Sequence, residues 1–592
     1  MTPCQQWHGM SLNAFPLNLT VLTLHLILNL PLPRSLMAFP FHSSTPPPDH
    51  RLSHPLSQLS QAVDSELLES YETHLQNSQA TPLSRADRNL CVEFVRGLAG
   101  PNNDSTSSLR MAPESPLPLS SLLTSSTPRA FHVGTGLSVT TLLSSIIASA
   151  DSEVLFVTCF WSPSESREIF SDALRTLSER RIASGSKDKV KVRIGFSSSG
   201  VWQKLSHPST PRGKEYLPET WEKLGLPALQ ELEGLDVGVR SIFYLPFSVL
   251  HGKFCIVDRK VLVLPSSNVS WEVWGECASI FEGGIVNTFL KFWKGVWGFG
   301  PESEELEDAS KEDLLVADLD GAGSIDHSLT PISAPVAMSE FPSNPAITYP
   351  TLFIPQPHHR NPRFHLPRPL SCLSPRPAPP IYPQTPQNAL ILLAIARAER
   401  SVYIQTPNLT SQPLIDALAT AVRRGVVVEL VTCRRMMLLE QIVTTAGAGV
   451  TEWCVRRLVK RVVNNGLPDG ERGAGGGGGR GLWVYYYSGP VSSKSATHEE
   501  HTAGHAMQHA VKSHVKAMIV DNRITVLGSA NGDRASWYTS QEVNIAVFSE
   551  DFAEVVRRDL VEGLGGRLEC VYAGREGECV LGVMARGWRE GV

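Results

Sequence analysis

The fold is decided by two stretches of sequence, His251-Gly-Lys-Phe-Cys-Ile-Val-Asp258 and His514-Val-Lys-Ala-Met-Ile-Val-Asp521. The second stretch lies 263 residues after the first, and each continues into a Ser-x-Asn turn and a glutamate. The residues that follow each histidine at equal offsets are Lys253 and Lys516, Asp258 and Asp521, Ser266 and Ser529, and Asn268 and Asn531, before Glu276 at +25 and Glu542 at +28. A single His-x-Lys recurs by chance, whereas five positions repeated in register indicate a repeated functional unit.

In both stretches the histidine and the lysine alternate with apolar residues, which predicts strands. Positions i and i+2 of a strand face the same side, so the imidazole and the ammonium group are expected to point into one cleft. A phosphodiester gains negative charge on its equatorial oxygens during transfer, and two lysines with two asparagines form a clamp for that charge without a metal. Of the two histidines, one can attack phosphorus while the other protonates the leaving oxygen.

The segments before each motif alternate between helical and extended patterns. Apolar spacing predicts helices at 137–150, 166–181, 390–397 and 414–423, and strands at 154–160, 190–196, 239–245, 402–405, 426–432 and 482–487. This order predicts an α/β sandwich with a largely parallel sheet in each half. Because the order recurs, the chain reads as a diverged internal duplication.

Composition divides the chain into four regions. Residues 1–130 are rich in Ser, Pro and Thr and are expected to be a largely disordered or helical accessory region, with one helical stretch at 56–76 and a short apolar stretch at 92–98. Residues 131–300 form the first predicted lobe and 387–592 the second. Between them, 301–386 reads as a linker that is first acidic and then Pro-rich. The second lobe carries a Gly-rich insertion at 464–481. It matches the Gly-x-Gly-x-x-Gly pattern of dinucleotide-binding turns, but no strand leads directly into it and no helix follows it, so a dinucleotide site is not expected.

Charge and cysteine content narrow the class of protein. The net charge of -5 over 592 residues gives no global attraction to nucleic acid, which weakens a nucleic-acid partner without excluding it. The ten cysteines form no Cys-x-x-Cys pair, so neither a zinc site nor a disulfide framework is expected, and a reducing compartment is the default. We expect no cofactor and no metal.

The N-terminus leaves the location open. An apolar run at 12–32 is interrupted by Pro16 and Asn18 and lacks a preceding basic segment, so a membrane anchor or signal is the weaker reading, and a start at Met37 would remove the run. We expect an intracellular protein, cytoplasmic or peripheral on a membrane, with a mitochondrial location open.

Two further segments have alternative readings. The histidines near the second motif, His498, His501, His505 and His509, would suit a zinc site, but a polar insertion is the preferred interpretation. The segment 453–463 places four basic residues among Val and Leu, as in a helix that touches anionic phospholipid or in an ordinary surface helix.

The pattern His-x-Lys-x4-Asp-x6-Gly-Ser-x-Asn resembles the signature of the phospholipase D superfamily, which includes phospholipases D, cardiolipin synthases, phosphatidylserine synthases and some nucleases. The second copy matches it through Gly528 to Asn531, and Tyr403-Ile-Gln-Thr-Pro407 with Arg424-Gly-Val-Val-Val428 resembles cardiolipin-synthase-like members. The resemblance in order and motif covers about 130–550.

This resemblance implies two packed lobes with pseudo-two-fold symmetry, an active site at their interface and a covalent phosphohistidine. By the same similarity His251 would be the nucleophile and His514 the general acid, although members differ and the sequence leaves the two roles open. Glu276 and Glu542 would each orient a histidine. The motif aspartates are expected to support loops more than to touch substrate.

The first copy departs from the signature at Pro265, which stands where the second has glycine. Proline supplies neither a positive φ nor an N–H, so a reshaped first loop and an impaired site are expected alternatives.

Three function classes remain. We expect a phosphodiesterase or phosphatidyltransferase that acts on phospholipids, contacts a membrane peripherally and works as a monomer because both motifs lie in one chain. The alternatives are a nuclease of the same superfamily, and a catalytically impaired lipid-binding relative.

Overall fold

The computed structural model describes most residues between 69 and 574, in the ranges 80–99, 119–208, 210–244, 248–298, 336–341, 347–358, 382–436, 449–464, 481–489 and 509–574, with single residues before 117. All of them belong to one compact unit, residues 58–592. The predicted N-terminal apolar run, Met37 and the Gly-rich insertion lie outside the described residues.

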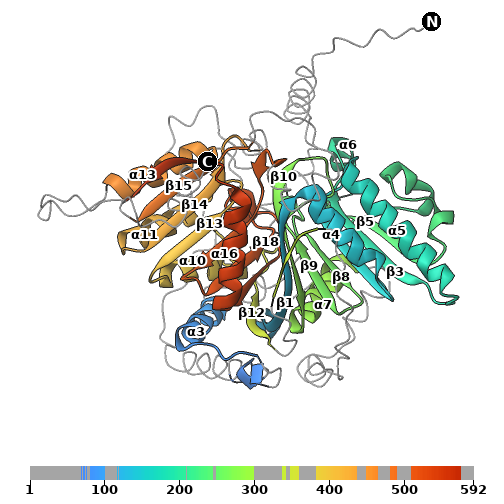
Figure 1. Ribbon diagram of the computed structural model, residues 1–592, viewed down its shortest axis with the longest axis horizontal. Helices are drawn as coiled ribbons and strands as arrows, with labels where there is room; N and C mark the ends of the chain where they lie inside the picture. Colours follow the sequence, from blue (N-terminus) through green and yellow to red (C-terminus); the bar gives the residue numbers. More distant parts are fainter. Residues whose placement is uncertain are drawn as a thin grey trace, which may run out of the picture. The chain divides into compact units, whose positions relative to one another are not determined.

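The first half of this unit is a mixed sheet flanked by helices (Figure 1). Three strands are parallel to one another: β2 (Glu153–Phe160), β3 (Val190–Ser198) and β5 (Leu235–Ser241). An antiparallel series continues from β2 through β8 (Phe254–Val257), β9 (Val261–Pro265), β10 (Trp274–Glu282) and β1 (Leu123–Thr135). The helices are α4 (Gly136–Ala148), α5 (Glu165–Ala183), the short α6 (Val201–Leu205) and α7 (Gly284–Trp297), and minor strands are β4 (Lys214–Glu215), β6 (Phe243–Tyr244) and β7 (Ser248–Val249).

The second half repeats this arrangement. Its parallel strands are β13 (Ser401–Gln405), β14 (Val427–Cys433) and β15 (Leu482–Tyr487). Its antiparallel series runs from β13 through β17 (Ala517–Val520), β18 (Ile524–Gly528), β19 (Asn544–Phe548) and β12 (Tyr349–Phe353), while β20 (Leu568–Ala573) pairs with β15. The helices are α10 (Pro386–Arg397), α11 (Gln412–Arg423), α13 (Thr451–Asn464), α15 (Arg534–Tyr538) and α16 (Glu550–Leu564).

The two halves also share strand register. Phe254 pairs with Val157 where Ala517, 263 residues later, pairs with Gln405. Pro265 pairs with Ala278 where Gly528 pairs with Asn544. The two motif segments therefore occupy equivalent places in equivalent sheets.

Most predicted elements are confirmed, and two predictions about the sheet are wrong. The sheet is mixed and not largely parallel, because the motif strands β8 to β10 and β17 to β19 follow one another through short turns and so must run antiparallel. His251 and Lys253 also precede β8 and do not lie in it, as His514 and Lys516 precede β17. The predicted strand at 239–245 starts earlier, at Leu235, and breaks at Ile242.

The predicted domain limits also need correction. Strand β1 begins at Leu123, inside the region assigned to the accessory N-terminus, and α3 (Arg85–Ala99) packs against α10, where Glu93 pairs with Arg397 at 2.8 Å. Within the predicted linker, β11 (Ser339–Glu340) and β12 pair with β1. The short run Tyr349–Phe353 supplies a strand even in Pro-rich surroundings, because Pro350 lies near its start and outside the residues that pair with β19.

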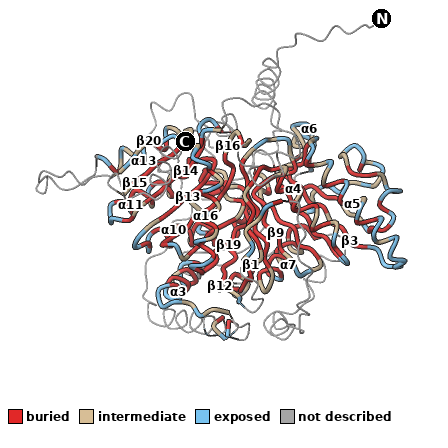
Figure 2. Tube along the Cα trace, viewed as in Figure 1, coloured by how far each residue is buried: buried red, intermediate tan, exposed pale blue. Residues whose placement is uncertain are grey.

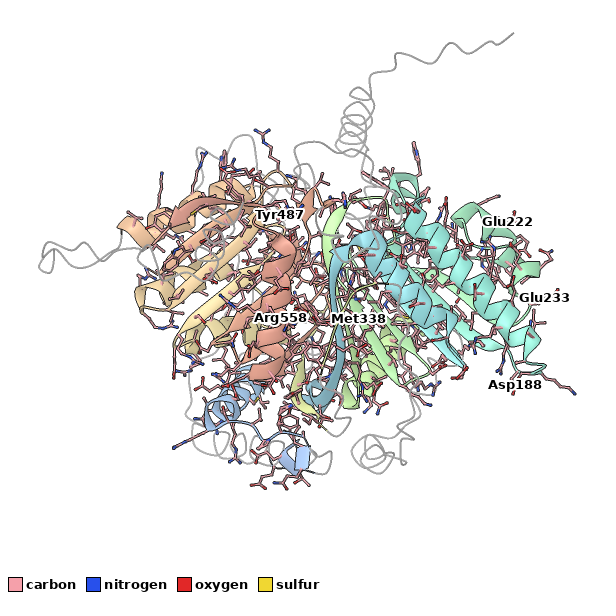
Figure 3. The ribbon with its side chains drawn as sticks, in the orientation of Figure 1. Asp188, Glu222, Glu233, Met338, Tyr487 and Arg558 are labelled. Carbon is pink, nitrogen blue, oxygen red and sulfur yellow. The ribbon has the colours of Figure 1, made fainter. Side chains whose placement is uncertain are left out.

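The halves are joined through strands and side chains. The start of β1 pairs with β12, and β10 pairs in parallel with β16 (Lys512–Ser513). Arg558 of α16 donates to Ser339 at 3.1 Å, close to Met338 (Figure 3). Phe552 packs on Phe281 with ring centroids 5.8 Å apart. Buried residues run continuously through the strands, whereas exposed positions gather on helices and loops (Figure 2).

Candidate active site

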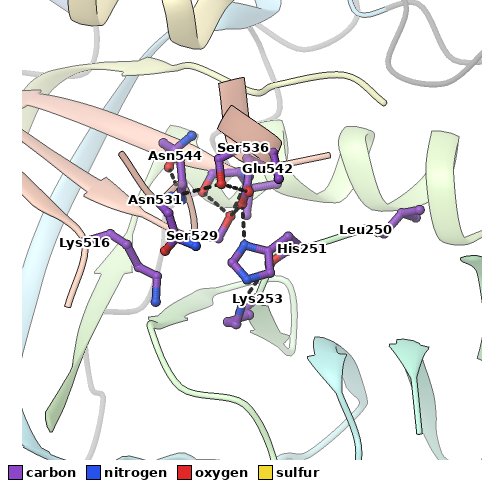
Figure 4. A network of polar contacts seen from close by, with 12 residues as sticks. Leu250, His251, Lys253, Lys516, Ser529, Asn531, Ser536, Glu542 and Asn544 are labelled. Atoms are coloured by element: carbon purple, nitrogen blue, oxygen red, sulfur yellow. Dashed lines mark hydrogen bonds and ion pairs between the residues drawn. The ribbon is translucent and has the colours of Figure 1, made fainter. Parts of the chain in front are cut away.

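The histidines pair with glutamates of the opposite half. Nδ1 of His251 lies 2.8 Å from Oε2 of Glu542, as Figure 4 shows, and Nδ1 of His514 lies 2.8 Å from Oε1 of Glu276. A carboxylate only accepts hydrogen bonds, so each Nδ1 carries the proton and donates it. Nε2 of each neutral imidazole therefore holds the lone pair.

Backbone bonds place each histidine beside its glutamate. The N–H of His251 donates to the carbonyl of Gln541 at 2.7 Å, and Gln541 directly precedes Glu542. The N–H of His514 donates to the carbonyl of Gly275 at 2.7 Å, directly before Glu276. These bonds belong to short parallel bridges between the halves, of Leu250 with Gln541 and of Ser513 with Gly275.

The motif serines hold the glutamates of their own halves. Ser529 donates to Oε2 of Glu542 at 2.5 Å, and Ser266 donates to Oε2 of Glu276. Glu542 also accepts a bond from Ser536 at 2.6 Å through Oε1. Buried carboxylates need such donors, so these bonds fix each glutamate in position.

The two motif lysines are buried beside the histidines. Nζ of Lys253 donates to the carbonyl of His251 at 2.8 Å, and Nζ of Lys516 donates to that of His514 at 2.5 Å. Each ammonium group thus folds back onto its own histidine. Two buried lysines so close to two imidazoles favour an anion, and a bound anion in turn raises the pKa of Lys516.

Burial and neighbouring charges set the ionisation of the site. Burial lowers the pKa of His514 to about 3, against the opposing charge of Glu276, and the pKa of His251 is also lowered by burial. Burial lowers the pKa of Lys516 to about 7. Burial acts to raise the pKa of Glu276, but His514 and Lys516 outweigh it and the pKa is lowered. At neutral pH both imidazoles are therefore uncharged.

The motif asparagines differ between the halves. Oδ1 of Asn268 accepts the N–H of Phe160 at 3.2 Å. Nδ2 of Asn531 donates to Oδ2 of Asp533 at 3.1 Å, and burial raises the pKa of Asp533. Asn531 is buried, whereas Asn268 is only partly buried. The two turns thus offer different surroundings on the two sides of the site.

The loop after Pro265 keeps the bonds of its counterpart. Ser266 donates its N–H to the carbonyl of Cys277 at 2.8 Å, as Ser529 does to the carbonyl of Val543 at 3.0 Å. A Cβ at Gly528, where φ is 157°, would overlap the carbonyl oxygen of Val543. Pro265 is not among the residues with positive φ, so the backbone of the first half differs at this position. Ser266 thus keeps its bonds to Cys277 and Glu276 although proline precedes it.

The motif aspartates do not join the histidines. Each follows the far end of its strand in a tight turn, where φ is 51° for Asp258 and 52° for Asp521. Asp258 accepts the N–H groups of Asp151, Ser152 and Glu153, and Asp521 those of Glu399, Arg400 and Ser401, at 2.7 to 3.0 Å. They fix the turns before neighbouring strands, which is the supporting role expected of them from the sequence.

Sequence reasoning missed two neighbours of the dyads. Ser536 has no counterpart at the equivalent first-half position, which is Val273, so the register comparison gave no signal for it. The ring of Trp274 lies 4.8 Å from that of His514, between centroids. Trp274 precedes the predicted site residue Glu276 by two residues, and this short distance along the sequence could have indicated that Trp274 lies near the site.

Of the remaining predicted features, the basic helix at 453–463 is confirmed as α13. His498, His501 and His505 lie outside the described residues. Among the helices that the structure describes, none combines the length and apolarity required to cross a bilayer.

Comparison with known proteins identifies the second half most directly. Residues 391–562 match the family described as "Cardiolipin synthase, PLD-like domain". No curated protein matches the sequence.

Solved structures resemble the chain at low identity. The phosphatidylserine synthase of Haemophilus influenzae is 12% identical with a TM-score of 0.43, over 78% of this chain and 95% of that one. Nuc, a phospholipase D family member from Salmonella typhimurium, is 18% identical with a TM-score of 0.21, over 32% of this chain and 91% of that one.

Proposed function

Because the chain belongs to the phospholipase D superfamily, we propose that it is a metal-independent phosphodiesterase or phosphatidyltransferase that acts on phospholipids. The observation that carries this proposal is the pair of crossed dyads, His251 with Glu542 and His514 with Glu276. Two neutral imidazoles with fixed tautomers beside two buried ammonium groups suit displacement at an anionic phosphorus.

In the first step Nε2 of His251 forms a bond to phosphorus while the bond from phosphorus to the leaving oxygen breaks. His514 gives that oxygen a proton from Nε2. The empty site holds His514 neutral, but a bound phosphodiester anion raises the pKa of neighbouring bases, so proton uptake accompanies binding. Glu276 stabilises the resulting imidazolium.

In the second step His514 accepts a proton from water or from a glycerol-type alcohol. The deprotonated oxygen attacks phosphorus, the P–N bond breaks, and His251 returns to its neutral form. Attack by water gives phospholipase D chemistry, and attack by an alcohol gives a cardiolipin-synthase-like transfer. In both steps Lys253 and Lys516 stabilise the charge on the equatorial oxygens.

We further propose that the halves, 131–300 and 387–592 with β1 and β12 added, are duplicated lobes related by a pseudo-two-fold axis. Equal strand order and equal register support this proposal. One chain then supplies both halves of the site, which is consistent with activity as a monomer.

The test is incubation of the purified protein with phosphatidylglycerol, phosphatidylcholine and a single-stranded oligonucleotide in chelator, with products followed by mass spectrometry. The expected products are phosphatidic acid or cardiolipin, absent with His251→Ala and with His514→Ala. Cleavage of the oligonucleotide alone would replace the lipid proposal with a nuclease. No turnover of any substrate would favour the impaired lipid-binding relative.

A further inference from the structure

Three tryptophans are strongly exposed in the part of the chain that the structure describes. Trp202 is 76% exposed, Trp271 is 68% exposed and Trp453 is 63% exposed. Large aromatic side chains in water usually mark a surface that contacts something else. We call these three residues the tryptophan rim.

Two members of the rim adjoin the first Ser-x-Asn turn. Trp271 follows Asn268 by three residues. Trp202 lies in α6, directly after β3, and the last carbonyl of β3 accepts the N–H of Trp161 at 2.8 Å. Trp161 in turn bridges Val269, the neighbour of Asn268. Both tryptophans therefore lie at the end of the sheet that carries His251.

The third member adjoins the equivalent turn of the second half. Trp453 lies in the first turn of α13, two residues after Thr451. Oγ1 of Thr451 accepts the N–H of Leu409 at 3.1 Å, and Leu409 bridges Gly532, the neighbour of Asn531. Because His251 contacts Glu542, the active-site ends of the two halves meet, and the rim flanks one site from both sides. In Figure 1, α6 and α13 lie toward the same upper edge.

Two members of the rim have exposed aliphatic neighbours. Val201 and Leu205 lie on α6 with Trp202, and Val273 lies two residues after Trp271. Nucleobases also stack on tryptophan, but aliphatic neighbours offer bases no partner and instead suit hydrocarbon. A tryptophan surrounded by aliphatic side chains is typical of the interfacial region of a bilayer.

The exposed face of α13 adds positive charge. Arg456 and Lys460 are exposed and follow Trp453 at +3 and +7, so the three side chains share one helix face. The opposite face packs into the core through Cys454, Val455, Leu458 and Val462. The chain has a net charge of -5, so this local basic face is the part that complements an anionic surface.

We propose that the tryptophan rim and the basic face of α13 dock the protein on a bilayer that contains anionic phospholipid. The active site then opens toward the layer that supplies its substrate. This inference rests on the proposed function, since a phospholipid substrate gives the docking its purpose.

The test uses the full chain with Trp202→Ser, Trp271→Ser and Trp453→Ser combined. A matched control combines Ile182→Ser and Leu229→Ser, two exposed hydrophobic residues next to the amino ends of β3 and β5. Binding is measured by sedimentation with phosphatidylcholine vesicles, with and without phosphatidylglycerol. Activity is measured on these vesicles and on a monomeric short-chain phospholipid.

The rim variant is expected to lose at least about tenfold in vesicle partitioning, since three interfacial anchors are removed. The ratio of its vesicle activity to its monomer activity is expected to fall by a similar factor, while the control keeps both. Arg456→Gln with Lys460→Gln is expected to weaken only binding to vesicles that contain phosphatidylglycerol. His251→Ala is expected to bind vesicles as the wild type does.

Vesicle binding by the rim variant equal to that of the control would overturn the docking proposal. Loss of oligonucleotide binding in the rim variant, with vesicle binding intact, would overturn it in favour of base stacking. Rim-dependent vesicle binding without turnover of any lipid would support docking and contradict the proposed function. Turnover of the monomeric lipid without vesicle binding would support the proposed function and contradict the docking proposal.

Discussion

Replacing Glu542 by glutamine tests the crossed dyads. Glu542 is completely buried and accepts bonds from His251, Ser529 and Ser536. Glutamine keeps the shape of this side chain and removes its charge. Its amide can also donate to Nδ1 of His251, which would move the ring proton to Nε2 and block the nucleophile. Glu276→Gln is the matched variant on the other dyad.

The size of the effect follows from the bond that is lost. A hydrogen bond to a charged group contributes about 1.5–3 kcal/mol, and at about 1.36 kcal/mol per decade this is roughly 10- to 150-fold in rate. The wrong histidine tautomer adds to this loss. In a Ser-His-Asp triad, replacing the aspartate by asparagine gives the wrong tautomer and lowers kcat by about 10⁴-fold. We therefore expect kcat of Glu542→Gln to fall by at least about tenfold and by up to about 10⁴-fold.

The assay compares a phospholipid with a phosphodiester that has a p-nitrophenyl leaving group. This leaving group departs without a proton, so it removes the need for a general acid, which is worth about 10² to 10⁴ in rate. Glu276→Gln and His514→Ala are expected to regain most of the rate of the first step, measured as the burst of p-nitrophenolate in the first turnover, since His514 is needed again only as the base of the second step. Glu542→Gln and His251→Ala are expected to stay slow on both substrates.

The crossed pairing is tested by which glutamate variant behaves like which histidine variant on the two substrates. If Glu542→Gln behaves like His514→Ala, and Glu276→Gln like His251→Ala, the crossed pairing is wrong. If the pairs hold but the rescued pair is Glu542 with His251, the dyads are correct and the proposed roles of the two histidines are exchanged.

Four further predictions follow from the same geometry. Asp521→Ala leaves the N–H groups of Glu399, Arg400 and Ser401 without their acceptor, so chemical denaturation should show a loss of about 2–4 kcal/mol, whereas inactivity at full stability would contradict a turn-fixing role. Pro265→Gly should lower stability by about 0.4–1 kcal/mol through the unfolded chain and leave kcat near that of the wild type; a large gain in kcat would show that proline impairs the site. Because burial lowers the pKa of His514 to about 3 from 6.5, the unfolded chain binds more protons below pH 6.5. Stability should therefore fall by up to about 1.4 kcal/mol per pH unit as pH drops toward 3, and an equally steep fall in His514→Gln would exclude this histidine as the cause. Ser536→Ala removes one donor to Glu542 and should lower kcat by about 10- to 150-fold with little change in KM, and a rise in KM alone would assign Ser536 to substrate binding.

The sequence alone predicted the elements and the chemical groups of the site. Strands such as Leu482–Tyr487 and helices such as α5 follow from side-chain periodicity, which is a local property. The repeated offsets from His251 and His514 identified the lysines, serines and asparagines, because both motifs have the same internal spacing. The β1 and β12 strands escaped notice because they lie in segments rich in Ser, Thr and Pro.

The tertiary structure decided which groups act together. His251 meets a glutamate 291 residues away, and His514 meets one 238 residues away. No local pattern encodes such contacts, since they arise only when β10 and β16 pair and the two halves close on each other. Packing within each half holds the aspartates in turns away from the histidines and places Ser536 on Glu542. Spacing along the chain determined the residue types, and packing between the halves determined their partners.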